Sequence, residues 1–240
     1  MIVALVLVVV VALSLLWPLP GRTPGAARPR GSLPIRDTGP YWRRMYSRRS
    51  FLRLGGALAG AGALAYSGLD EDLETWHARR RGPGSDVVAR AAKLQGERFW
   101  FLAWATATAL DAGWRSSAFT RWGRKNFEAM LVGLPTLWTL QYGLGSARPD
   151  HEGASPRWTP LEGHYAASGH TFMAAVPWLN LARRLGHPSA RATAGVLSTV
   201  TGWSRLNDRS HYPSQVLLGW MVAWNATGSA SENVSGPPLA

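Results

Sequence analysis

The 240-residue chain contains no cysteine. Disulfides and a thiolate nucleophile are therefore excluded, and a zinc site would need histidine and carboxylate ligands. Long apolar runs are also scarce: residues 99–110 and 216–224 fall well short of the roughly 20 residues that a membrane-spanning helix needs. With 46% apolar and 17% charged residues the chain is too apolar for a disordered polymer. Its mean hydropathy of -0.08 is low for a protein made only of membrane spans.

Lysine is also in short supply, because Lys93 and Lys125 are the only lysines among 26 basic residues. The formal net charge is +12, and much of it comes from residues 1–81, which hold 12 arginines against five acidic residues. A nucleic-acid-binding protein is expected to carry a basic stripe, interleaved with aromatic side chains, on its folded part. The later arginines are scattered singly or in pairs, so we expect no nucleic-acid partner.

The N-terminal part resembles an export signal. Residues 2–16 are almost wholly aliphatic, and the sequence SRRSFLR at residues 47–53 resembles a twin-arginine signal. A Gly/Ala-rich stretch and a small-x-small cleavage site at residues 63–65 follow it. Because such signals begin a chain, we expect Met45 to be the biological start; the alternative is an ordinary basic loop before a helix.

The expected organisation has five parts. Residues 1–44 are an untranslated extension or an apolar membrane segment, 45–65 the signal, 66–85 a linker, 86–226 a helical domain, and 227–240 a disordered tail.

From residue 86 onward the apolar pattern is helical, without strand-like alternation. The sequence predicts an all-α fold, a bundle of about five core helices whose active site lies at one end, in the loops before the third and last helices. The many tryptophans either fill the core or form a belt at a membrane interface. Helices are expected at residues 86–112, 117–146, 170–185, 188–203 and 213–226.

The loops between these helices gather residues suited to one ligand. Arg148 and Arg205 carry planar guanidinium forks that match phosphate oxygens better than a lysine does. Ser168 and Gly169 precede an apolar run, so they place a hydroxyl and free backbone N–H groups at a helix N-terminus, a natural anion site. Two histidines, His170 and His211, titrate near neutral pH. The set indicates a site for a phosphate-like anion.

In order and spacing, these blocks resemble the three signature motifs of the type-2 phosphatidic acid phosphatase and vanadium haloperoxidase superfamily. The family patterns are Lys-x6-Arg-Pro, Pro-Ser-Gly-His and Ser-Arg-x5-His-x3-Asp. This chain has Gln141-x6-Arg148-Pro149, Ala167-Ser168-Gly169-His170 and Ser204-Arg205-x5-His211-x3-Gln215.

The resemblance implies a role for each matching residue. His211 is the implied nucleophile that forms a phosphohistidine, and His170 the general acid for the leaving oxygen. The phosphate oxygens would be held by Arg148, Arg205, Ser168 and Gly169, with Gln141 at the position of the family lysine. No metal or cofactor is implied, except vanadate if the chain is a haloperoxidase.

Two motif positions have lost charge. Gln141 stands where the family has lysine, and Gln215 where it has the aspartate that orients the nucleophilic histidine. An amide still hydrogen-bonds but brings no charge. The sequence alone therefore predicts that Gln215→Asp raises turnover.

Three functions remain open at this stage. The first is an exported phosphatase, periplasmic or on the outer side of the inner membrane, acting on lipid phosphates or small phosphomonoesters close to a membrane. The second is a non-catalytic protein that binds phosphate or a lipid headgroup. The third, a vanadate-dependent haloperoxidase, ranks last because those chains are generally much longer. The sequence leaves the oligomeric state open.

Overall fold

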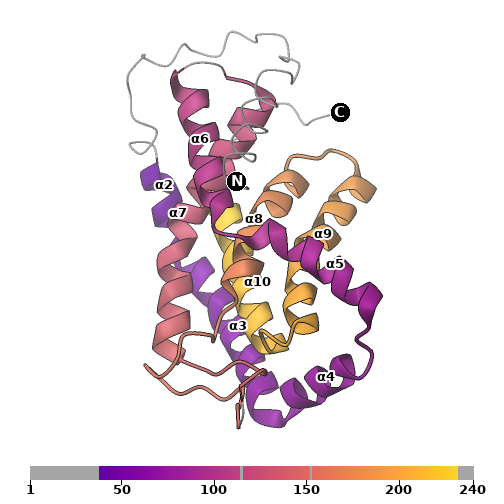
Figure 1. The fold of residues 1–240 in the computed structure, drawn as a ribbon. Coiled ribbons are helices and arrows are strands. Elements are labelled where there is room, and N and C mark those ends of the chain that lie inside the picture. Colours follow the sequence, from indigo (N-terminus) through magenta and orange to yellow (C-terminus); the bar gives the residue numbers. More distant parts are fainter. Residues whose placement is uncertain (1–37, 114–115, 152, 232–240) are drawn as a thin grey trace.

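The computed structural model describes residues 38–113, 116–151 and 153–231. Within these ranges the chain forms nine α-helices and no strand, which confirms the all-α class (Figure 1). Most of the expected extension, residues 1–37, lies outside the described residues, as does the end of the expected tail. The helices are α2 (Gly39–Met45), α3 (Arg48–Ser67), α4 (Leu69–Ala78), α5 (Pro83–Lys93), α6 (Phe99–Gly113), α7 (Ala118–Leu144), α8 (Gly169–Ala182), α9 (Pro188–Asn207) and α10 (Pro213–Ser231).

Four of the five expected helices are confirmed, as α7 to α10, although α10 continues to Ser231 into the expected tail. The first expected helix, residues 86–112, is wrong as a single element. It is divided into α5 and α6 by a short 3₁₀ helix, η2 (Leu94–Gly96). Gly96 lies at the break, where a helix interior disfavours glycine, and its backbone packs closely on α8.

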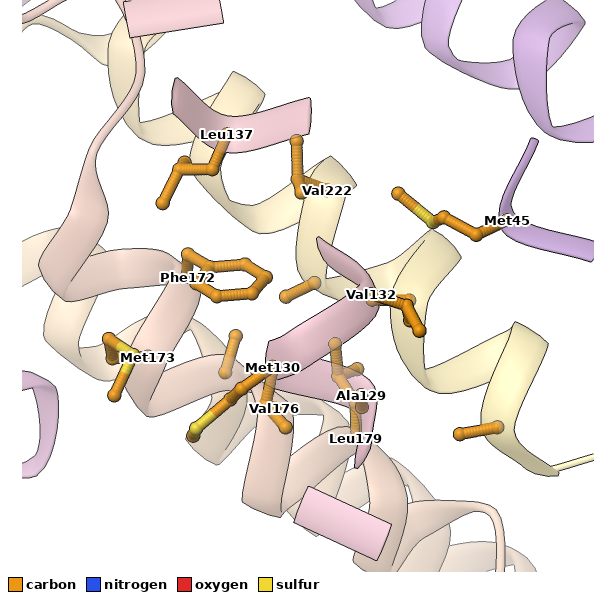
Figure 2. Close-up of a cluster of buried hydrophobic side chains, with 14 of the residues drawn as sticks. Met45, Ala129, Met130, Val132, Leu137, Phe172, Met173, Val176, Leu179 and Val222 are labelled. Carbon is orange, nitrogen blue, oxygen red and sulfur yellow. The ribbon is translucent and has the colours of Figure 1, made fainter. Parts of the chain in front are cut away.

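The core lies where α7, α8 and α10 meet. Phe172 of α8 is fully buried, and Figure 2 shows it beside Leu137 of α7 and Val222 of α10. α3 closes the other side of α10 with a face of mostly small residues, whose spacing follows the helical period. That buried face consists of Ser50, Leu54, Ala57, Ala61 and Ala65.

The expected export signal falls on α3. Ser47 caps this helix by accepting a hydrogen bond from the Ser50 backbone N–H, and Arg48 and Arg49 are exposed in its first turn. Positive charge is unfavourable at a helix N-terminus, where the macrodipole is itself positive. Helix stability therefore does not explain these two arginines, and the twin-arginine signal stays a prediction.

The tryptophans divide between the core and the surface of the protein. Trp104 is 4% exposed and packs in the core, whereas Trp138 is 53% and Trp224 38% exposed. Across the described residues, no helix has both the length and the apolar character needed to cross a membrane.

The segment expected to be a linker contains α4, and α4 supports the start of α10. Asp70 of α4 is fully buried and accepts hydrogen bonds from the Ser214 backbone N–H, at 2.9 Å, and from the Ser214 hydroxyl. An acidic group at a helix N-terminus satisfies free N–H groups and favours the macrodipole. Burial raises the pKa of Asp70, and the two bonds from Ser214 oppose that rise.

Asp70→Ala should lower the free energy of unfolding by about 2 kcal/mol, because it removes two hydrogen bonds to a carboxylate and a helix cap. Asp72→Ala, an exposed position on the same helix, is the matched control and should change stability by less than about 1 kcal/mol. Urea unfolding at neutral pH measures both variants. Equal midpoints for the two variants would show that the contact does not support α10.

Candidate active site

The candidate residues come from four helix ends that meet at one end of the bundle, where α7 and α9 stop and α8 and α10 begin (Figure 1). Gln141, near the end of α7, donates a hydrogen bond from Nε2 to the Ala167 carbonyl oxygen at 2.9 Å. The Ser168 backbone N–H in turn donates to the Gln215 carbonyl oxygen of α10. The first and second motifs are thereby joined to the third.

Ser168 is the N-cap of α8. Its Oγ accepts hydrogen bonds from the Thr171 backbone N–H at 3.3 Å and the Thr171 hydroxyl at 2.9 Å. The close approach of α10 holds it in place, since a Cβ on Gly219 would lie 2.3 Å from the Ser168 carbonyl oxygen. Gly169 and His170 form the first turn of α8, so their N–H groups belong to the free donors of the helix N-terminus.

The turn after α9 brings Arg205 and His211 together. Arg209 adopts a left-handed backbone conformation, φ 52°, and the N–H groups of Ser210 and His211 both donate to the Arg205 carbonyl oxygen. This closed turn accounts for the five-residue spacing between the two motif residues. Arg205 is 3% exposed and pairs with Asp208, while Arg209 pairs with Glu74 of α4.

Gln215 fixes the protonation pattern of His211. Gln215 Oε1 lies 2.8 Å from His211 Nδ1 and also accepts the Tyr212 backbone N–H at 3.2 Å. Gln215 Nε2 donates to the Ala147 carbonyl oxygen at 2.8 Å and to Ser146 Oγ at 2.9 Å. Because an N–H only donates and a carbonyl only accepts, the orientation of the amide is determined. His211 therefore carries its proton on Nδ1, and Nε2 has a free lone pair.

Arg148 follows α7 in the loop that covers His211. Its guanidinium stacks 4.1 Å from the ring centre of Tyr165, and that ring lies edge-on to His211 with the centres 6.4 Å apart. The buried Nε of Arg148 has no hydrogen-bond partner among the described residues. A buried donor without a partner is costly, so it indicates a place for an acceptor from a ligand.

Both histidines are held neutral near pH 7. Burial, together with the positive charges of Arg148 and Arg205, lowers the pKa of His211 to about 3, although the hydrogen bond to Gln215 opposes the shift. Burial, followed by the charge of Arg205, also lowers the pKa of His170, and Glu97 opposes that shift. The causes of the two shifts place Arg205 near both histidines, and Arg148 and His170 near His211.

The PAP2 superfamily model matches residues 127–231. The matched segment runs from within α7 to the end of α10 and contains all eight candidate residues. A match to this superfamily supports a phosphatase- or haloperoxidase-like hydrolase in general terms. No curated protein and no solved structure matched the chain.

Sequence reasoning missed three neighbours of the motif residues. Asp208, within the five-residue spacer of the third motif, pairs with Arg205. Tyr165, which stacks on Arg148, and Glu97, whose Oε1 lies 3.5 Å from His170 Nε2, lie outside the motifs. The position of Asp208 three residues after Arg205, at a helix end, was a usable signal for that pair. Nothing local in the sequence marks the other two.

Proposed function

We propose that the chain is a PAP2-type phosphatase that hydrolyses phosphomonoesters through a phosphohistidine on His211. The observation that carries this proposal is the Gln215 amide, which leaves His211 Nε2 unprotonated beside two arginines. Nε2 attacks phosphorus while Arg148 and Arg205 neutralise charge on the phosphate oxygens, and His170 protonates the leaving oxygen. Water then attacks the phosphohistidine, with neutral His170 accepting its proton.

Loss of the family aspartate leaves this mechanism intact in outline. Gln215 still selects the Nδ1–H tautomer, but it does not stabilise the cation that forms on His211 during attack. Reduced turnover is the expected consequence. Export by the twin-arginine signal belongs to the same proposal, and the exposed Arg48 and Arg49 support it because α3 gains no stability from them.

The proposed function is tested with purified full-length protein on three substrates: 4-nitrophenyl phosphate, a short-chain phosphatidic acid and a phosphodiester. We expect phosphate release from one or both monoesters, none from the diester, and inhibition by vanadate, which mimics the five-coordinate transition state. Calorimetric binding of inorganic phosphate without any hydrolysis would favour the binding protein instead. Vanadate-dependent bromide oxidation would favour the haloperoxidase.

Arg148→Lys should weaken inorganic phosphate binding by about 10- to 100-fold, because a lysine supplies neither the planar fork nor the stack on Tyr165. Arg157→Lys is the matched control, since Arg157 is exposed in the same loop. Titration calorimetry measures both affinities. Equal affinities in the two variants would remove Arg148 from the anion site.

The pH profile should be acidic. His211 must be neutral to attack, and its pKa of about 3 allows this throughout the mildly acidic range. His170 must be protonated to act as an acid, and its pKa lies below 6.5, so kcat/KM falls as pH rises through that value. We expect an optimum below pH 6.5, measured from pH 3 to 9. A rate still rising above pH 8 contradicts these assignments.

The lowered pKa of His211 also makes the stability of the fold depend on pH. The folded-state pKa of His211 lies below its unfolded value of 6.5, so the unfolded chain binds the proton more readily. The stability that neutral His211 contributes above pH 6.5 is therefore lost as pH falls toward 3. Circular dichroism at each pH separates loss of fold from loss of activity.

A further inference from the structure

Glu97 lies against the candidate general acid because η2 packs directly on the start of α8. A Cβ built on Gly96 would be 2.5 Å from the His170 carbonyl oxygen and 2.9 Å from its Cα, both backbone atoms that cannot move aside easily. Only a glycine permits this approach, and the next residue along the chain is Glu97. The packing of two backbones therefore sets the position of this carboxylate.

Hydrogen bonds from other helices hold η2 and the end of α5 in this position. The Trp178 indole of α8 donates to Gln95 Oε1 at 2.7 Å, and the Trp100 indole of α6 donates to the Leu94 carbonyl oxygen at 2.8 Å. The Thr201 hydroxyl of α9 donates to the Ala92 carbonyl oxygen at 2.8 Å. Glu97 therefore follows a segment that is held by hydrogen bonds from α6, α8 and α9.

Glu97 acts on the protonation of His170 in the opposite direction to the positive charges around it. Arg205 of α9 and Lys93 of α5 both disfavour a proton on His170, and His211 would add to them if it were charged. Glu97 is the carboxylate that acts in the opposite direction, with Oε1 3.5 Å from His170 Nε2. This separation is longer than a hydrogen bond, so the pair interacts through charge in the resting site. His170 Nε2 is buried and has no other partner among the described residues.

We propose that Glu97 is a positioning residue whose carboxylate favours the protonated form of His170, the form that acts as general acid. The inference rests on the proposed phosphatase function. As the imidazolium forms, Nε2–H stays with Glu97 and the other ring nitrogen gives its proton to the leaving oxygen. The P–O bond breaks, the alcohol departs with that proton, and the bond from phosphorus to His211 Nε2 is complete.

The direct test follows the titration of His170 by NMR in the protein without substrate, with His170→Gln used to assign the signal. Glu97→Gln should lower the pKa of His170, and Lys93→Gln should raise it, because the two side chains carry opposite charges. Glu97→Asp keeps the charge and should restore part of the shift. A general disturbance of the fold would not move the pKa in opposite directions, and an unmoved pKa in Glu97→Gln overturns the proposal.

Kinetics provide a second readout. Losing the carboxylate that orients a functional histidine costs about 10- to 100-fold in metal sites. We expect about 10-fold in kcat for Glu97→Gln, with KM little changed and the basic limb of the pH profile moved to lower pH. An inert wild-type chain that still shows the opposite NMR shifts refutes the phosphatase function but supports the pairing of Glu97 with His170. An active chain whose basic limb does not move in Glu97→Gln refutes the pairing.

Discussion

His211→Gln should reduce phosphomonoester hydrolysis by about 10⁴- to 10⁶-fold, the range expected when a covalent nucleophile is removed. Glutamine is uncharged, polar and close to histidine in size, so it suits a position that is 5% exposed. Its amide nitrogen can still donate to Gln215 Oε1, but it offers no lone pair to attack phosphorus. Steady-state rates on 4-nitrophenyl phosphate measure the loss.

The control for His211→Gln is His187→Gln. His187 is exposed at the N-terminus of α9 and takes no part in the candidate site. This variant should retain the wild-type rate. If His211→Gln kept more than about one tenth of the wild-type turnover, the nucleophile would have to be sought elsewhere.

Gln215→Met should lower kcat by about 10²- to 10⁴-fold, the upper value being the cost of losing the tautomer in a serine-protease triad. Methionine fills the buried volume but accepts no strong hydrogen bond, so the proton of His211 is no longer held on Nδ1. The variant also leaves the Ala147 carbonyl and Ser146 hydroxyl without their donor, so some loss of stability accompanies it. Circular dichroism and urea unfolding must therefore accompany the rates.

Gln215→Glu is the matched comparison for Gln215→Met. A protonated glutamic acid reproduces the amide, since one oxygen accepts from His211 while its O–H donates to the Ala147 carbonyl. We expect it to exceed Gln215→Met in turnover, with the largest difference at acidic pH. Equal rates for the two variants would show that orientation of His211 is not the function of this side chain.

The structure also changes what is expected of Gln215→Asp. Sequence reasoning predicts a gain in turnover, because the family has aspartate at this position. In the fold, the glutamine amide donates two hydrogen bonds on its far side, to Ala147 and Ser146. Aspartate is one methylene shorter and has no N–H to replace these two hydrogen bonds. Their loss offsets the gain in turnover that its negative charge would bring. These partners lie almost 70 residues away in the chain, which is why local spacing could not reveal them.

Spacing predicted the helices that carry the motifs because each is a long, periodic apolar run bounded by turn residues. The same method failed at residues 86–112, where no local signal outweighs helical periodicity and the break arises from packing of Gly96 against α8. Helix α4 lies in the segment that the sequence predicts to be a linker. This helix supports the fold through a long-range hydrogen bond, from the Ser214 backbone N–H to Asp70.

In the candidate site, too, the sequence predicted some features and not those that depend on long-range contacts. The order and spacing of the three sequence motifs predicted which side chains gather at one end of the bundle. They could not predict that Asp208 neutralises Arg205 or that Tyr165 stacks on Arg148, because these contacts depend on the path of the loops. Nor could they reveal Glu97, which reaches His170 from a different part of the chain.

The central claim is that His211 becomes phosphorylated. Rapid quenching of the wild-type enzyme with labelled phosphomonoester, followed by peptide mapping under alkaline conditions, tests it most directly. The account predicts an acid-labile phosphate on the peptide that contains His211, formed and lost at rates consistent with turnover, and absent from His211→Gln. Turnover without label on that peptide, or label on another residue that persists in His211→Gln, would contradict it.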